Sequence, residues 1–209
     1  MMKPIFSLIV FLGVASLAFG ANEDSKKKGT QVIDAAKLTE VCTTCHSTQG
    51  INIAPNFPSL AGQGAKYLAK QTMDIKAGIR NVPEMLPFVK DMSKEDINKI
   101  ASFYASLPAP SGVTESKHIS LGEQIYRGGS DNSPPCMECH APSGNGIALA
   151  GFPRLAGLHA DYIIKQLTDF REKRRDNDDN AIMRDVSSRL SNAEIEAVAH
   201  YIQGLGKNE

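Results

Sequence analysis

Two five-residue stretches carry residues whose types and spacing fit cofactor chemistry. Residues 42–46 are Cys-Thr-Thr-Cys-His and residues 136–140 are Cys-Met-Glu-Cys-His. Both match Cys-x-x-Cys-His, the pattern that attaches haem c. Residues three apart on a helical turn share a face, so both thiols can add to the vinyl groups on one porphyrin edge while the histidine faces the iron. The sequence therefore predicts two covalently bound haem c groups. The attachment residues are Cys42, Cys45, Cys136 and Cys139, and the iron-binding histidines are His46 and His140.

Three other interpretations of the cysteines compete with haem attachment. Two local disulfides would suit an exported protein, but they leave the histidine after each pair unexplained. A structural zinc site uses similar pairs, although the interval from Cys45 to Cys136 is much longer than in a zinc ribbon. Thioredoxin-like redox pairs need a βαβ pattern that surrounds neither motif. Haem attachment is favoured because it accounts for every cysteine and for both histidines.

Each iron also needs a ligand opposite its histidine, or it stays open to small molecules. A thioether is a soft ligand that raises the reduction potential. Met85 and Met183 hold equivalent places in two similar halves of the chain, each in a loop ahead of the last helix. Met92 is the rival in the first half, but its equivalent is Leu190, which cannot bind iron. We therefore expect Met85 and Met183 to be the second axial ligands.

The remaining histidines do not recur between the halves. Position 159 corresponds to Gly64 and position 200 to Ser102, and His118 comes just after the linker. We expect surface or packing roles for His118, His159 and His200.

An internal repeat divides the chain into two halves. Residues 57–62 (Phe-Pro-Ser-Leu-Ala-Gly) return as residues 152–157 (Phe-Pro-Arg-Leu-Ala-Gly). A turn-rich linker at 108–112 separates the halves, which predicts domains at 21–112 and 113–209. Other recurring pairs are Tyr67 and Tyr162, Gln71 and Gln166, and Arg80 and Arg175.

Helices are expected to position both motifs, and no stretch alternates as a strand would. A short helix leads into each motif, at about 34–41 and 120–127, and a middle helix begins near Ala65 and Ala160. A last helix begins at Ser93 and at Ser191, because serine is a good N-cap and Glu194 completes a capping box. The predicted fold class is all-α. With no Trp and 6% aromatic residues, each half has a weak core that a buried haem would complete.

Residues 1–20 are predicted to be a cleaved signal peptide, because Lys3 precedes an apolar stretch and Ala18 and Gly20 are small residues. That stretch is shorter than the roughly 20 residues of a spanning helix, so at most peripheral membrane association is expected. Export to the periplasm fits covalent haem attachment. The chain has 23 basic and 23 acidic residues, and nothing suggests a nucleic-acid partner.

The chain resembles the cytochrome c4 family. The resemblance rests on the tandem haem motifs, the paired Phe-Pro-x-Leu-Ala-Gly motifs, residues 127–129 (Arg-Gly-Gly) and residues 166–171 (Gln-Leu-Thr-Asp-Phe-Arg). It implies two tandem class I cytochrome c domains with His/Met ligation, joined by a short linker, with haems close enough for fast electron exchange. It also implies that Pro58 and Pro153 lie beside the histidines, where a carbonyl can accept from imidazole Nδ1–H.

The resemblance implies a periplasmic electron carrier that is not an enzyme. Its expected partners are redox proteins such as a terminal oxidase and its donor complex. One alternative is a two-haem peroxidase, which needs an iron that opens to peroxide. The other is the haem subunit of a sulfide-oxidising flavocytochrome c.

Overall fold

The structure is a computed structural model that describes residue 1 and residues 35–51, 54–114, 116–130 and 133–206. By its contacts the chain divides into Met1–Val32 and the compact unit Ile33–Glu209. Apart from Met1, the predicted signal peptide lies outside the described residues. Within those residues, no helix has both the length and the apolar character needed to cross a membrane.

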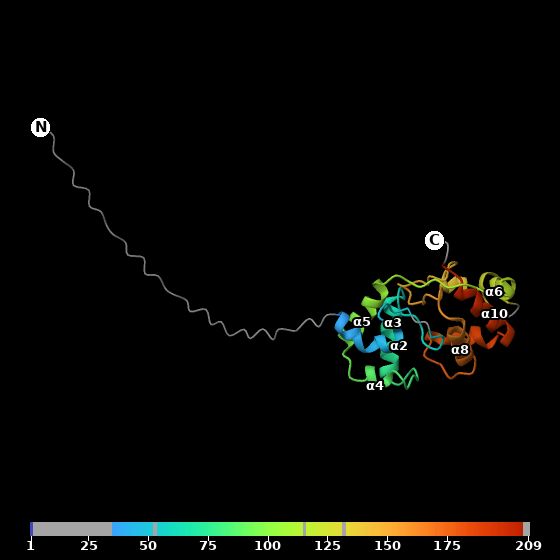
Figure 1. Cartoon of the computed structure of the whole chain (residues 1–209), viewed down its shortest axis with the longest axis horizontal. Helices are drawn as coiled ribbons and strands as arrows, with labels where there is room; N and C mark the ends of the chain where they lie inside the picture. Colours follow the sequence, from blue (N-terminus) through green and yellow to red (C-terminus); the bar gives the residue numbers. More distant parts are fainter. Residues whose placement is uncertain (2–34, 52–53, 115, 131–132, 207–209) are drawn as a thin grey trace. The chain divides into compact units, whose positions relative to one another are not determined.

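Every regular element of the described residues is a helix (Figure 1). Two isolated β-bridges, Ser130 with Ser133 and Ile147 with Phe152, are the only extended pairings described. The all-α prediction is therefore confirmed. The first half contains α1 (Ala35–Thr39), η1 (Glu40–Cys42), α2 (Thr43–His46), α3 (Ala65–Lys76), α4 (Leu86–Val89) and α5 (Lys94–Ser106). The second contains α6 (Ser116–Gly128), α7 (Met137–His140), α8 (Ala160–Arg171), η2 (Asp179–Ala181), α9 (Ile182–Ser188) and α10 (Asn192–Gln203).

The predicted helix starts agree closely with the structure where a local signal sets them. Helices α3 and α8 begin at Ala65 and Ala160. Ser93 Oγ accepts from the Asp96 amide at 3.0 Å, and the capping box of α10 is complete. The helices ahead of the two motifs differ from expectation. The first is broken into α1, η1 and α2, and the second, α6, is longer than predicted at both ends.

The loop placement is wrong for Met183, which lies within a helix, but not for Met85, which lies in the turn ahead of α4. Met85 is the N-cap of α4, and Met183 is the second residue of α9. Pro87 explains why α4 can begin directly after Met85, because proline fits the first turn of a helix, where an amide donor is not needed.

Each half has its own apolar core. In the first half, Ile97, Ala101 and Tyr104 of α5 pack with Leu68 and Ala69 of α3. In the second half, α10 packs against both α6 and α8, and it buries the predicted stripe almost completely. The stripe consists of Ile195, Val198, Ala199 and Ile202. Among the described residues, the core of the first half is the smaller of the two.

Polar side chains join the two halves within the compact unit. The Gln63 side chain pairs with the backbone of Arg154, donating to its carbonyl and accepting from its amide at 2.8 Å each. The Lys70 ammonium donates to the Asn177 carbonyl at 2.7 Å. Arg80 donates to Tyr162 and Gln166, and its repeat equivalent Arg175 donates to Tyr67 and Gln71. Residues that mark the repeat in sequence therefore lie at the contact between the halves.

Candidate functional site

Each Cys-x-x-Cys-His motif lies on a single helical turn. Cys42 is the N-cap of α2, which ends at His46, and Cys136 is the N-cap of α7, which ends at His140. This arrangement puts the two cysteines of a motif on one face, as the spacing predicts. The four cysteines, all of them among the described residues, form no disulfide.

The backbone turns sharply after each histidine. Ser47 has φ 59° and ψ 165°, and Ala141 has φ 66° and ψ 156°. This region is almost exclusive to glycine, so each residue carries backbone strain, which typically marks a functional site. The Ser47 amide donates to Thr43 O at 2.9 Å, and its hydroxyl donates to Ile51 O at 2.7 Å. The same strained turn at equivalent positions shows that both histidines are presented in the same way.

The two histidines have the same hydrogen-bond geometry. Nδ1 of His46 lies 2.9 Å from the Pro58 carbonyl oxygen, and Nδ1 of His140 lies 2.9 Å from that of Pro153. A carbonyl only accepts, so Nδ1 carries the proton and Nε2 carries the lone pair that can bind a metal. Burial lowers the pKa of His46 and His140, although each proline carbonyl opposes the shift. Both rings are therefore neutral and buried, as an iron ligand must be.

The repeated Phe-Pro-x-Leu-Ala-Gly motif brings each carbonyl to its histidine. Leu60 N and Ala61 N donate to Gly50 O at 2.7 and 3.0 Å. Their equivalents, Leu155 N and Ala156 N, donate to Gly144 O at 2.8 and 3.1 Å. These bonds tie the motif to the loop that follows the histidine. The proline carbonyls thus lie where the family resemblance implied.

The phenylalanine that opens each motif contacts the histidine ring edge to face. The ring centroids of His46 and Phe57 are 6.3 Å apart, and those of His140 and Phe152 are 6.4 Å apart. The rings of each pair are steeply inclined, at 74° and 62°. Each imidazole is held by a hydrogen bond on one edge and by an aromatic neighbour, so its direction is fixed.

The first cysteine of each motif packs against the apolar core of its half. Burial raises the pKa of the Cys42 thiol, and it raises the pKa of Cys136 to about 11. Both thiols are protonated at neutral pH, so neither resembles the activated thiolate of a redox enzyme. Among the described residues, the cysteines are not part of any group whose ligand atoms converge for metal binding.

The methionines separate into two kinds. Met73 and Met92 pack against the first core, and Met137 packs against the second. Met85 and Met183 are partly buried and belong to neither core among the described residues. Leu190, the equivalent of Met92, is 4% exposed in the second core. The packing of Met92 supports Met85 as the candidate ligand of the first half.

Sequence reasoning missed one cluster. It treated His118 and His200 separately, but the structure brings them together with Glu196. His159, in contrast, is the N-cap residue of α8 and stays outside this cluster. The spacing of Glu196 and His200, four residues apart in a predicted helix, was the available signal.

Comparison with known proteins agrees with this architecture. Residues 119–206 match the family model described as cytochrome c, and residues 27–103 match the one described as cytochrome c oxidase, cbb3-type, subunit III. Cytochrome c4 of Pseudomonas aeruginosa is 45% identical over 98% of this chain and 100% of its own length. The thiosulfate dehydrogenase electron acceptor of Stutzerimonas stutzeri is 36% identical over 94% of each chain.

Among solved structures, reduced cytochrome c4 from Pseudomonas stutzeri superposes with a TM-score of 0.80 at 46% identity. The match covers 82% of this chain and 96% of that one. Together with the two family matches, it confirms the predicted fold of two tandem cytochrome c domains.

Proposed function

The chain belongs to the cytochrome c4 family, and on this premise we propose that it carries electrons in the periplasm to a terminal oxidase and catalyses no reaction of its own. It is an electron-transfer cytochrome with two covalently bound haem c groups. The observation that carries the proposal is the duplicated donor set. Each half has its own buried histidine at 2.9 Å from a proline carbonyl and its own methionine outside the core.

The proposal assigns a role to each site residue. The cysteines of the two motifs form the thioether links, and His46 and His140 bind the irons through Nε2. Met85 and Met183 would be the second ligands of the first and the second iron. When bound, each haem supplies an iron that gains and loses one electron. The complete set is Cys42, Cys45, Cys136 and Cys139 for attachment, with His46, Met85, His140 and Met183 as axial ligands.

This ligand set favours a carrier over an enzyme. With a histidine and a methionine both held as its ligands, the iron of each half would offer no position for a substrate. The histidine is kept in place by its carbonyl partner and buried ring, so it does not need to reorganise when an electron arrives. The soft thioether favours the reduced iron and raises the potential. A peroxidase would instead need one iron that opens.

The surface near the methionines suits a protein partner. Leu86 and Phe88 follow Met85 and are 41% and 51% exposed, and Ile182 beside Met183 is 40% exposed. The chain carries 23 basic and 23 acidic residues, so its net charge does not steer association over long distances. We infer docking through apolar contacts near the haem edges, with a few charges setting orientation.

The relative from Stutzerimonas stutzeri favours a second candidate function. That protein is named as the electron acceptor of a thiosulfate dehydrogenase and matches 94% of this chain. Under this alternative, the present chain would accept electrons from such an enzyme before passing them on. The two candidates differ in the electron donor and share the same haem chemistry.

The periplasmic location rests on the predicted signal peptide at residues 1–20, which lies outside the described residues. The domain limits 21–112 and 113–209 also remain predictions. N-terminal sequencing of the mature protein tests the first, because a start near Ala21 is expected. A start at Met1 would contradict export by cleavage.

Stopped-flow spectroscopy tests the carrier proposal. Reduced holoprotein is mixed with membranes that contain a terminal oxidase, over a range of ionic strengths. Fast oxidation of both haems is expected, with rates that fall only mildly with salt because few charges are screened. The oxidised protein is mixed separately with thiosulfate and a thiosulfate dehydrogenase. Fast reduction there would support the second candidate.

Two outcomes would replace the proposal. Substantial peroxide turnover by the isolated protein would show that one iron opens, as in a peroxidase. Copurification with a flavin subunit, together with sulfide oxidation, would indicate the haem subunit of a flavocytochrome c. If the reduced protein is not oxidised by the oxidase membranes, the terminal oxidase is rejected as its partner.

A further inference from the structure

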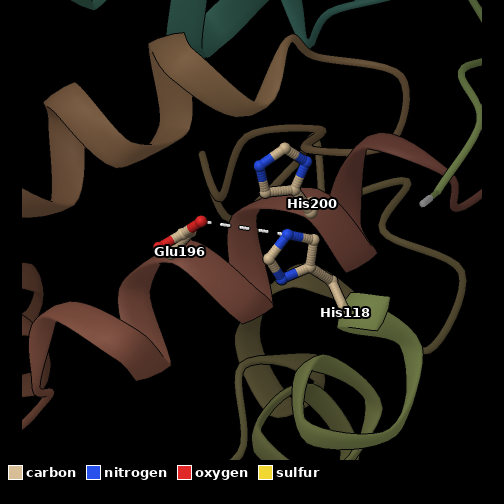
Figure 2. Close-up of side chains that lie close together, drawn as sticks. All are labelled: His118, Glu196 and His200. Carbon is tan, nitrogen blue, oxygen red and sulfur yellow. Dashed lines mark ion pairs between the residues drawn. The ribbon is translucent and has the colours of Figure 1, made fainter. Parts of the chain in front are cut away.

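Three side chains with metal-binding groups meet where α6 packs against α10 (Figure 2). His118 extends from α6, and Glu196 and His200 lie one turn apart on α10. Their candidate ligand atoms all lie within 4.8 Å of one another. Among the described residues this is the only such group of three or more. It shares no residue with the haem motifs or with Met85 and Met183.

The two imidazole rings stack face to face. Their centroids are 4.2 Å apart and their planes differ by 4°. Nε2 of His118 is buried and has no hydrogen-bond partner, since the nearest Glu196 oxygen lies 3.9 Å away, beyond hydrogen-bond range. A buried ring nitrogen without a partner is destabilising. The site therefore contains an imidazole nitrogen, His118 Nε2, that has no hydrogen-bond partner and lies near the Glu196 carboxylate.

We propose that His118, Glu196 and His200 bind a divalent transition-metal ion of the Zn²⁺ or Cu²⁺ type. Imidazole nitrogens suit these ions, and a carboxylate completes a common three-residue set. Ca²⁺ and Mg²⁺ prefer sites made of oxygen ligands, and this group offers one carboxylate. The Glu196 side chain is 55% exposed, so the fourth position on the metal is open to water.

Binding requires movement of the side chains but not of the helices. Zn–N bonds of about 2.0–2.1 Å place neighbouring ligand atoms about 3.3 Å apart in a tetrahedral site, closer than the present upper spread of 4.8 Å. The stacked rings must tilt, because parallel lone pairs do not converge on one ion. The exposed Glu196 side chain can rotate inward.

The backbones of α6 and α10 are already close enough for the three side chains to reach one ion. A Cβ atom added at Gly122, one turn after His118, would lie 2.5 Å from Tyr201 Cβ. Helices α6 and α10 are therefore in close contact beside the cluster. A bound ion would link the first and last helices of the second half and stabilise that half against unfolding.

The first half provides an internal comparison. By the repeat register, Glu196 corresponds to Asn98 and His200 corresponds to Ser102. Neither residue is a usual ligand for Zn²⁺. The proposed site is therefore specific to the second half, and a bound ion should stabilise the two halves unequally.

Calorimetric titration of the oxidised holoprotein with zinc chloride tests the proposal. One ion per chain is expected, with an unchanged Soret spectrum because the haem irons are not involved. His118→Gln and His200→Gln should each weaken binding by at least about tenfold, and Glu196→Gln by about two- to tenfold. His159→Gln is the matched control, since His159 lies in the same half but outside the cluster, and its affinity should equal that of the parent.

Thermal melting gives a second readout. Zinc should raise the melting temperature of the parent and of His159→Gln, but not that of His118→Gln. The proposal is overturned if the parent binds no zinc, or if the two histidine variants bind as tightly as the parent. If the histidine variants do not fold, the exposed Glu196→Gln variant decides, and unchanged zinc affinity there overturns the proposed three-residue site.

Discussion

Arg175 donates from Nη2 to the side-chain oxygen of Gln71, in the opposite half, at 3.0 Å. Arg80 makes the equivalent bond to Gln166 at 3.1 Å. Each arginine also donates to the glutamine of its own half, at 2.8 Å for Arg175 and 2.9 Å for Arg80. Two guanidinium groups and two amides thus form one nearly symmetric network between the halves. Because Arg175 and Gln71 are buried, losing one partner leaves the others unsatisfied.

Arg175→Lys should weaken the association of the halves. Lysine offers a point charge rather than a planar fork, so it cannot serve Gln71, Gln166 and Tyr67 together. We expect a loss of about 2–4 kcal/mol in unfolding free energy, measured by denaturant unfolding of the holoprotein.

Arg189→Lys is the control for this change. Its partner Asp185 lies one turn away on an exposed surface of α9, where ion pairs contribute little, so a change within about 0.5 kcal/mol is expected. Equal effects of the two variants would show that the network between the halves adds no stability.

Met183→Ala and Met85→Ala should each open one iron. Removal of the thioether lowers the potential of that haem and allows it to bind CO, because a coordination position becomes vacant. Redox titration and CO difference spectra of the holoprotein measure both effects, and half of the haem should respond in each variant.

Met92→Ala separates ligation from packing. Met92 packs against the first core, so its truncation should cost about 1–3 kcal/mol of stability without creating CO binding. If Met92→Ala opens the first haem and Met85→Ala does not, the ligand of the first half is Met92.

Replacement of both cysteines of one motif should remove one haem. Cys136→Ser with Cys139→Ser leaves no thiol to form a thioether in the second half. Mass spectrometry in acidified solvent should then show the mass of one haem instead of two. The matched variant at Cys42 and Cys45 should lose the other haem. Retention of both haem masses in either variant would contradict the attachment sites.

Gly122→Ala should destabilise the packing of α6 on α10, although alanine is the better helix former. The added methyl group would collide with the Ala197 carbonyl and with Tyr201 Cβ. The expected loss is about 1–3 kcal/mol in thermal or denaturant unfolding.

Gly128→Ala, at the end of the same helix, is the control, because nothing lies within 4 Å of the added atom. It should be neutral or stabilise by about 0.4–1 kcal/mol, through a smaller entropy of the unfolded chain. A destabilisation equal to that of Gly122→Ala would show that helix packing is not the cause.

Glu194 should make the stability of α10 sensitive to acid. Its carboxylate accepts from the amide and the hydroxyl of Ser191 at 2.7 Å each, and these bonds lower the pKa of Glu194. Because the pKa of Glu194 is lower in the folded state, the carboxylate stabilises the fold at pH values above the pKa of the unfolded state, which is about 4.3 for glutamate. This stabilisation is lost as pH falls through the folded pKa.

Glu194→Gln keeps an acceptor for the Ser191 amide but removes the negative charge at the start of α10, so it should cost about 0.3–1 kcal/mol at pH 7 and progressively less below pH about 5. Unfolding curves measured across this range test the prediction. Glu84→Gln, on an exposed side chain in the turn ahead of α4, should change stability by less than about 0.5 kcal/mol at every pH. A cost for Glu194→Gln that does not vary with pH would exclude the carboxylate bonds as its source.

Local sequence patterns predicted the haem-attachment motifs and the starts of several helices. The spacing Cys-x-x-Cys-His, the N-caps Ser93 and Ser191 and the capping box with Glu194 all operate within one helical turn, so no distant partner is needed. The internal repeat added Met85 and Met183, since a methionine that recurs at equivalent positions is unlike one that fills a core. The family matches confirmed the fold class and the two haem c groups, while the axial methionines remain predictions.

Tertiary structure alone decided which distant residues meet. The sequence showed Tyr67, Gln71 and Arg80 as repeating residues, but only the packing of the halves places Arg80 within 3.2 Å of Tyr162. His118 and His200 are separated by 82 positions in the sequence, and the approach of α6 and α10 stacks their rings. Motif spacing and caps depend on bonds between near neighbours, which the sequence specifies directly. Contacts between helices depend on how all the buried surfaces fit together, and no single segment encodes that fit.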